Sequence, residues 1–299
     1  MDVQERLEKL KAEINKKAPP LPTVRLKPVR GETTVFDSKM GGVPYFPKDM
    51  EYPAVREGNS AGKPLKFLAQ LNFEKLPHIP GFPEKGILQF FAGYDGDDVF
   101  GLNFDDPTDQ NGFRVIYHEN ISEDADLINE LPEIETDDFP FTGEFLLKAE
   151  KAEQANVTYT DYRFDSALIE SYNSLFDANI NCVYAFNENA VGLNQIDNEL
   201  CEALFDNDED REDREDCGTR MGGYAYFTQD DPRRDTDKYG DFQVMLFQSD
   251  SENGNPNGDE RAYEDEIMWG DVGVANFFIS AADLAKRDFS RVLYNWDCC

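Results

Sequence analysis

Three aspartates at alternate positions form the most metal-like pattern in this sequence of 299 residues. Asp206, Asp208 and Asp210 open the stretch DNDEDREDREDC with the D-x-D-x-D spacing of an EF-hand calcium loop. The sixth loop position is Arg211 instead of the glycine that allows the sharp turn, and the twelfth is Cys217 instead of the bidentate glutamate. The sequence therefore predicts no cofactor, and loose Ca²⁺ binding by the three aspartates remains the weaker alternative.

Residues for nucleophilic or nucleotide chemistry are few. His78 and His118 are the two histidines, and the chain has no G-x-S-x-G nucleophile elbow, no P-loop and no G-x-G-x-x-G after a strand. Adjacent Cys298 and Cys299 lack the gap that lets two thiolates face one zinc ion. A Cys–His pair that meets only in the fold stays open. The sequence favours a protein without catalytic activity.

The stretch IMWGDVGVANFF, at residues 267–278, is the most site-like in the chain. Trp269 in a turn, Asp271 between glycines and Asn276 on a strand would supply one aromatic wall and two oriented polar groups. Small-molecule and peptide pockets combine such groups. A tight hairpin with Trp269 in the core is the plainer alternative.

A short sequence motif occurs twice in the chain. KMGGVPYFPKD at residues 39–49 resembles RMGGYAYFTQDDP at residues 220–232, and FLAQLN and GILQFF reappear in the same order as MLFQSD and GVANFF. These matches place Gln70 opposite Gln248 and Gln89 opposite Asn276. Three ordered matches predict a duplicated unit, each copy of which contributes strands to one compact body.

The repeated residues predict both turns and a binding groove. Paired glycines before a strand suit a turn with positive φ, which only glycine adopts at little cost; the four turn glycines are Gly41, Gly42, Gly222 and Gly223. Amides within apolar strands must find hydrogen-bond partners in the backbone, in each other or in a ligand. We expect a ligand groove where the two halves meet, lined by Gln70, Gln248, Asp250, Trp269, Asp271 and Asn276.

Hydrophobic periodicity supplies the elements that would position these residues. Val3, Leu7, Leu10 and Ile14 predict an amphipathic helix over about residues 2–17, which the prolines of APPLP end. Apolar runs predict strands at 67–73, 86–94, 113–118, 242–250, 273–280 and 291–296. Helical spacing predicts helices at 164–176, at 193–205 and near AADLAKR, whereas 144–153 fits either a helix or a strand.

Together these elements predict an α+β protein. Two internally duplicated, mostly antiparallel β-sheet halves pack as one globule, with a few peripheral helices and an N-terminal helix. We place the helix and its proline-rich connector at residues 1–22, the first half at 23–160 and the second half at 161–299.

Charge excludes several classes of partner. The net charge is −32, and residues 119–138, 202–216 and 250–266 hold 25 acidic and three basic residues, so these segments carry 22 of the net negative charges. Such a surface repels nucleic acid and anionic membranes. The first residues contain no apolar signal region, no apolar run approaches a membrane span, and the five cysteines show no disulfide spacing. We expect a cytoplasmic protein.

Several motifs carry a family resemblance from about residue 20 to the end. KMGGVPYFPKD, PLKFLAQLNFEKLP, DVFGLNFDDPTDQNGFRVIYHENI, RMGGYAYFTQDDPR, IMWGDVGVANFFIS and DLAKRDFSRVLYNWDCC resemble the YwqG-like family, a bacterial domain family of unknown function. The resemblance implies a cytosolic bacterial protein of mixed α and β structure with an internal duplication. It implies no activity, substrate or catalytic residue.

The function that the sequence favours is a non-enzymatic binding module that uses the groove between its halves. Its acidity favours a basic protein or cations as partner, and a small molecule is the other candidate. The alternative is an enzyme of unrecognised class with carboxylate chemistry at Asp250 and Asp271 in the groove.

Overall fold

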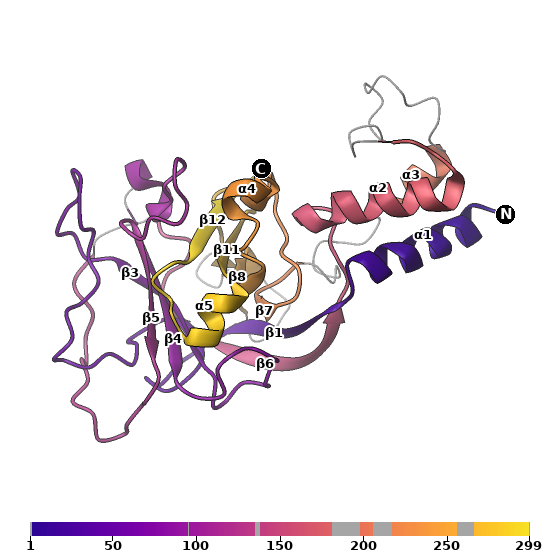
Figure 1. The fold of residues 1–299 in the computed structure, drawn as a ribbon. Helices are drawn as coiled ribbons and strands as arrows, with labels where there is room; N and C mark the ends of the chain where they lie inside the picture. Colours follow the sequence, from indigo (N-terminus) through magenta and orange to yellow (C-terminus); the bar gives the residue numbers. More distant parts are fainter. Residues whose placement is uncertain are drawn as a thin grey trace.

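A single antiparallel sheet dominates the fold. The computed structural model describes residues 2–94, 96–134, 138–180, 198–205, 217–255 and 266–298. In this part of the chain ten strands form one sheet in the order β12-β11-β8-β7-β1-β6-β2-β3-β4-β5, seen in Figure 1. The prediction of an α+β protein with a mostly antiparallel sheet, a few helices and an N-terminal helix is confirmed.

The strand order runs outward from two central strands. The central strands are β1 (Leu21–Arg30) and β6 (Glu144–Ala155). On one side lie β2 (Lys39–Gly41), β3 (Lys66–Asn72), β4 (Ile87–Ala92) and β5 (Phe113–His118). On the other side lie β7 (Arg220–Gly222), β8 (Val244–Asp250), β11 (Val274–Ile279) and β12 (Leu293–Asp297). A separate two-stranded sheet pairs β9 (Glu252–Asn253) with β10 (Glu266–Ile267).

Strand β1 and the strand identity of β6 were not predicted. Segment 21–30 contains Pro22 and Pro28, which cannot donate to a ladder and therefore argue against a central strand. The structure tolerates Pro28 because β7 pairs only with Thr23–Arg25 and does not reach it. Pro22 contributes its carbonyl, which accepts the main-chain N–H of Gly223 at 2.9 Å. The ambiguous segment 144–153 is a strand because both of its edges are paired, with β1 and with β2.

Aromatic side chains join the two ends of the sheet. Phe90 on β4 stacks on Phe247 of β8 with ring centroids 5.1 Å apart, and Phe277 of β11 lies 4.8 Å from the same ring. Strands β4 and β8 are far apart in the strand order, so the sheet folds back until its two sides face each other. All six residues of β4 and of β11 are buried, as their unbroken apolar runs predict.

Three of the described helices, α1 (Val3–Lys17), α2 (Tyr162–Phe176) and α3 (Asn198–Phe205), form a second layer beside β1 and β6 (Figure 1). The other described helices are α4 (Thr236–Tyr239) and α5 (Ala281–Lys286), with 3₁₀ turns η1 (Gly96–Gly101) and η5 (Pro232–Arg234). The predicted stripe Leu7, Leu10 and Ile14 is buried in one cluster with Leu168 of α2 and Leu200 of α3. Figure 1 shows α1, α2 and α3 together on one side of the sheet. No described helix is both long and apolar enough to cross a membrane.

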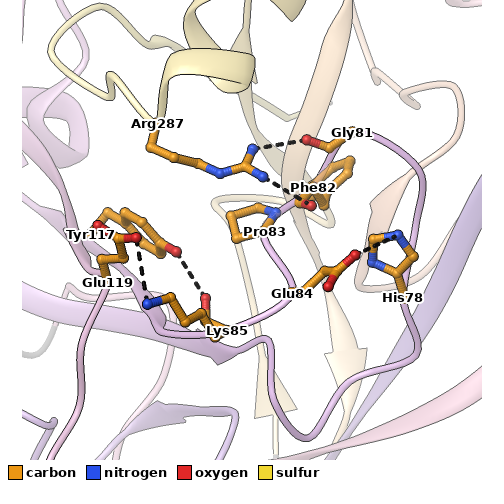
Figure 2. A pocket seen from close by; sticks show the side chains of 9 residues that line it. All are labelled: His78, Gly81, Phe82, Pro83, Glu84, Lys85, Tyr117, Glu119 and Arg287. Carbon is orange, nitrogen blue, oxygen red and sulfur yellow. Dashed lines mark hydrogen bonds and ion pairs between the residues drawn. The ribbon is translucent and has the colours of Figure 1, made fainter.

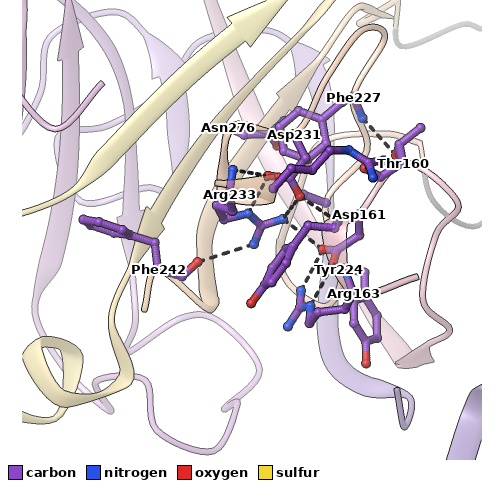
Figure 3. Close-up of polar contacts among 12 residues, drawn as sticks. Thr160, Asp161, Arg163, Tyr224, Phe227, Asp231, Arg233, Phe242 and Asn276 are labelled. Carbon is purple, nitrogen blue, oxygen red and sulfur yellow. Dashed lines mark hydrogen bonds and ion pairs between the residues drawn. The ribbon is translucent and has the colours of Figure 1, made fainter. Parts of the chain in front are cut away.

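A buried ion network joins this helical layer to the sheet. Arg233 is fully buried and donates from Nε and Nη2 to Asp231, at 2.8 and 2.7 Å, and from Nη2 to Asp161 at 2.9 Å. Asp161 caps the N-terminus of α2, and Asp231 accepts the main-chain N–H of Tyr162. Figure 3 shows Arg233 between the two carboxylates.

The charges in this network are compensated. Burial would raise the pKa of Asp161, but Arg233 and Arg163 hold that pKa at about 2. Burial also acts to lower the pKa of Arg233, and Asp161 and Asp231 outweigh it. The guanidinium of Arg233 lies 3.9 Å from the ring centroid of Phe278 on β11, so a cation–π contact links the network to the sheet.

Arg233→Met should therefore lower the free energy of unfolding by about 3–5 kcal/mol, because it leaves the buried carboxylate of Asp231 without its cation and Asp161 with Arg163 alone. Arg234→Met is the matched control. Arg234 pairs with Asp165 at the partly exposed surface, so its replacement should change stability by at most about 1 kcal/mol. Urea unfolding of both variants checks this, and equal losses would show that the network has no special role.

Candidate functional site

The four predicted turn glycines have the left-handed backbone that glycine favours. Their φ angles are 64° and 65° at Gly41 and Gly42, and 69° and 74° at Gly222 and Gly223. A Cβ at Gly41 would collide with the main-chain oxygen of Gly143, and a Cβ at Gly222 would lie 2.5 Å from the main-chain oxygen of Pro22. A side chain is therefore unfavourable at both positions, because the backbone has a positive φ and because a Cβ would collide with main-chain atoms.

A buried amide holds the turn that follows Gly41 and Gly42. The Oε1 atom of Gln70 accepts the main-chain N–H of Tyr45 at 3.0 Å, and its Nε2 donates to the carbonyls of Val35 and Asp37, both at 2.8 Å. The neighbouring strand adds Gln89, whose Nε2 donates to the carbonyl of Tyr45 at 2.6 Å. The protein itself therefore occupies the hydrogen-bonding atoms of Gln70.

Equivalent contacts surround Gln248 on β8. The Oε1 atom of Gln248 accepts the main-chain N–H of Tyr226 at 2.9 Å, and the Nδ2 of Asn276 donates to the Tyr226 carbonyl at 2.8 Å. The cationic residues before the glycines also correspond: the Nζ of Lys39 donates to the Val43 carbonyl, as the Nη2 of Arg220 donates to that of Tyr224.

The residues predicted to line a groove between the halves are mostly buried. Gln70, Gln248, Asp250, Trp269 and Asn276 are each at most 1% exposed, whereas Asp271 is exposed. The structure brings Gln248 and Asn276 together as cross-strand partners on β8 and β11, while Gln70 lies on β3 in the other half. Their burial weighs against ligand contact, and their role in binding stays a prediction.

Trp269 and Asp250 have internal partners as well. The Nε1 of Trp269 donates to the Oγ of Ser249 at 3.1 Å, in keeping with the plainer prediction of a core tryptophan. The carboxylate of Asp250 accepts the main-chain N–H groups of Gly218 and Ser251, at 2.7 and 2.8 Å.

No metal site emerges from the described part of the chain, where no group of three or more His, Cys, Asp or Glu side chains is placed to hold an ion. The predicted Ca²⁺ candidates Asp206, Asp208 and Asp210 lie outside the described residues. One carboxylate has a strongly shifted pKa: burial and then Asp250 raise the pKa of Glu252 to about 7. These two carboxylates alone are too few to form a cation cage.

One open pocket of about 600 Å³ lies where the two predicted halves meet (Figure 2). From the first half come the connection between β3 and β4 and the end of β5, and from the second half comes Arg287 after α5. Its lining residues are His78, Gly81, Phe82, Pro83, Glu84, Lys85, Tyr117, Glu119 and Arg287. Phe82 and Pro83 are buried and give the pocket an apolar floor, while the charged residues lie around the rim.

Main-chain hydrogen bonds hold the walls of the pocket. The Tyr117 hydroxyl donates to the carbonyl of Lys85 at 2.8 Å, and Arg287 donates from Nη1 to the carbonyl of Gly81 at 3.0 Å. Arg287 has a φ of 60° at the C-terminus of α5, where glycine is the usual residue. This arginine bridges the two predicted halves, since residues 81 and 82 belong to the predicted first half and residue 287 to the predicted second half.

The rim charges pair only loosely. His78 Nε2 lies 4.0 Å from Glu84 Oε1, and Lys85 Nζ lies 3.5 Å from Glu119 Oε1. All four side chains are at least half exposed, so these pairs contribute little to stability. Burial raises the pKa of Tyr117, although the positive charge of Arg287 acts to lower it. The rim therefore offers both positive and negative groups to a ligand.

The sequence predicted a site between the halves but not these residues. The sequence singles out His78 only as one of two histidines, and Arg287 has no motif around it that indicates binding. The only sequence signal for the pocket is the proline-rich connection KLPHIPGFP, whose stiffness favours a fixed wall.

A buried histidine, His118, extends the amide network of the first half. The Nε2 of Gln89 donates to Tyr45, so its Oε1 must be the atom that faces His118 Nε2, at 2.9 Å. Because an amide oxygen only accepts, the proton of the neutral ring lies on Nε2. Burial lowers the pKa of His118 to about 4.

Comparison with known proteins gives one family match. The family model DUF1963, described as a domain of unknown function, matches residues 38–298. No curated protein matches the chain. The match agrees with the predicted membership of a family of unknown function and does not test the YwqG-like name.

Gly41→Ala and Gly222→Ala should each destabilise the protein more than Gly62→Ala. All three glycines have positive φ, which alone makes alanine unfavourable by about 1–2 kcal/mol. Only at Gly41 and Gly222 does a Cβ also meet main-chain atoms, whereas nothing lies within 4 Å of one at Gly62. Thermal unfolding of the three variants measures the difference, and similar melting temperatures would contradict the collision.

Replacing His118 with Gln should make the free energy of unfolding less dependent on pH between neutral pH and about pH 4. The unfolded chain binds a proton near the ordinary pKa of 6.5, but the buried ring binds it only near 4. Stability is therefore lost as pH falls through this window, by about 3 kcal/mol for this residue. Urea unfolding of the wild type and His118→Gln from neutral pH to about pH 4 gives the difference. Parallel profiles would show that His118 does not contribute.

Proposed function

The chain belongs to the DUF1963 family, a domain family of unknown function, and on that premise we propose that it is a non-enzymatic binding module. Its ligand lies in the pocket lined by Phe82, Pro83, Tyr117 and Arg287. The observation that carries this proposal is the position of the pocket, since its walls come from both halves of the chain. Ligand sites favour such junctions between structural units.

The composition of the pocket supports binding. A volume of about 600 Å³ lies within the range of small-ligand pockets, which combine an apolar surface with a few oriented polar groups. Phe82, Pro83 and Tyr117 supply the apolar and aromatic surface. Arg287 and the rim charges supply the polar groups.

The lining supports binding better than catalysis. A nucleophile or general base needs a partner within hydrogen-bond reach. Among the described lining residues, the candidate pair His78 and Glu84 is 4.0 Å apart and exposed. The predicted enzyme alternative rests on Asp250 and Asp271, of which the first is buried against main-chain N–H groups and the second is exposed. No observation on these two carboxylates favours the enzyme.

The net charge of −32 restricts the ligand further. A field of this sign repels simple anions and attracts cations, so a basic protein partner at the acidic segments remains part of the proposal. A cytoplasmic location is likewise a proposal, as is the duplication of the two halves. The matching contacts around Gln70 and Gln248 support the duplication.

The proposal is tested by thermal unfolding of the full chain with amino acids, short peptides, dicarboxylates, polyamines and monosaccharides. A compound at ten times its Kd should stabilise the protein by about 1.4 kcal/mol, which raises Tm by about 2–4 °C. Glu84→Trp places a bulky side chain at the pocket rim and should abolish the shift. Glu123→Trp, at an exposed acid that does not line the pocket, is the matched control.

Two results would refute the proposal. In the first, no compound raises Tm. In the second, the shift survives in Glu84→Trp, which would place the ligand elsewhere on the protein.

A further inference from the structure

Arg287 presents one unused edge of its guanidinium group. Its Nη1 donates to the carbonyls of Gly81 and Leu284, at 3.0 and 2.7 Å, and its Nη2 donates to that of Phe82 at 3.4 Å. A guanidinium has five N–H groups, so the Nε–H and one Nη2–H remain. Within the described residues these two groups have no acceptor, and every bond of the side chain goes to a main-chain oxygen.

The two remaining N–H groups lie on the same edge of the group. They point in parallel, at the spacing of the two oxygens of a carboxylate, which is the side-on form of bidentate recognition. The three main-chain bonds fix the plane of the guanidinium, so little side-chain entropy remains to be lost when a ligand binds. Figure 2 shows Nε and Nη2 on the side of Arg287 that faces Pro83 and Lys85.

Carboxylates on the rim lie across from this edge. In Figure 2, Glu84 and Glu119 lie on the two flanks of the pocket, away from Arg287. Among the described residues each pairs only loosely, Glu84 with His78 at 4.0 Å and Glu119 with Lys85 at 3.5 Å, and Lys85 also donates to Asn120 at 2.8 Å. These carboxylates can therefore accept an ammonium group from a ligand without breaking a buried pair.

The net charge of the chain favours a zwitterion over a simple anion as the ligand of the pocket. A carboxylate with no other charge would be repelled by a protein of net charge −32. A ligand that also carries an ammonium group has no net charge and avoids this repulsion. It also places its positive group near Glu84 or Glu119.

We propose that the pocket binds a small zwitterion, either a free amino acid or a short peptide, with its carboxylate on the Nε–Nη2 edge of Arg287. The ammonium group lies against the rim carboxylates, and an apolar side chain lies against Phe82, Pro83 and Tyr117. This inference rests on the proposed function, because it names the ligand class of the same pocket.

Four probes with the same ring test the inference by calorimetric titration of the full chain. They are L-phenylalanine, glycyl-L-phenylalanine, phenylacetate and phenethylamine. The zwitterions should bind at least about tenfold more tightly than phenylacetate and phenethylamine, since each of those lacks one charged contact. The stronger of the two zwitterions shows whether the source is a free amino acid or a peptide.

Arg287→Lys keeps the positive charge and removes the side-on edge. It should weaken the zwitterions and phenylacetate by about tenfold or more and leave phenethylamine unchanged. Arg291→Lys is the matched control, because Arg291 pairs with Asp241 and does not line the pocket. It should bind all four probes as the wild type does.

A measurement on the wild type covers the case in which Arg287→Lys fails to fold. The Nε–H resonance of Arg287 should shift when L-phenylalanine, glycyl-L-phenylalanine or phenylacetate is added, and should stay in place with phenethylamine. An unmoved resonance at saturating zwitterion overturns the inference. So does phenethylamine binding as tightly as either zwitterion.

The failure of this inference differs from the failure of the proposed function. If a compound without a carboxylate raises Tm, Glu84→Trp abolishes that shift, and neither zwitterion binds more tightly than phenethylamine, the pocket binds a ligand and the zwitterion is wrong. If no compound does so and none of the four probes binds, both are wrong.

Discussion

The fold depends on amides that are buried inside apolar strands. Gln70 and Gln248 could not remain in β3 and β8 unless the chain supplied hydrogen-bond partners, because an unpaired buried amide is strongly unfavourable. The partners are the main-chain groups of the segments around Tyr45 and Tyr226. Those segments reach the amides only through the tight turns at Gly41 and Gly222. One requirement thus explains the glycines, the turns and the path of the chain around each amide.

A second buried polar group joins the layers. The helices and the sheet meet at Arg233, whose charge is shared by carboxylates at the start of α2 and at η5 and whose plane lies over Phe278. An apolar contact could join these layers as firmly. The ion network also fixes one orientation, because each carboxylate must keep both its cation and its main-chain N–H group. The helical layer therefore has one defined position relative to the strands.

Local patterns predicted most of this fold and little of the pocket. Unbroken apolar runs such as GILQFF and GVANFF predict buried strands, and the stripe Leu7, Leu10 and Ile14 predicts its helix. Strand β1 could not be predicted because Pro28 argues against a central strand. A proline in a strand is tolerated where the neighbouring strand ends before it, and the sequence does not show where β7 ends. The pocket depends on Arg287 meeting Gly81 and Phe82, more than 200 residues earlier, and no periodicity encodes such a meeting. The repeated motifs predict a site at the junction of the predicted halves, but the repeated amides Gln70 and Gln248 bind the main chain of the turns instead.

The position of β1 at the centre of the sheet has a consequence during synthesis on the ribosome. Strand β6 can cover one edge of β1 once residue 155 has emerged, but β7 ends only at residue 222. At translation rates of about 5–20 residues per second, the other edge of β1 stays bare for roughly 3–13 seconds. A bare edge invites pairing with neighbouring nascent chains. Pro22 and Pro28 cannot donate a hydrogen bond to a strand of another chain. The two prolines that argue against a strand in the sequence therefore also disfavour incorrect pairing of β1 before synthesis is complete.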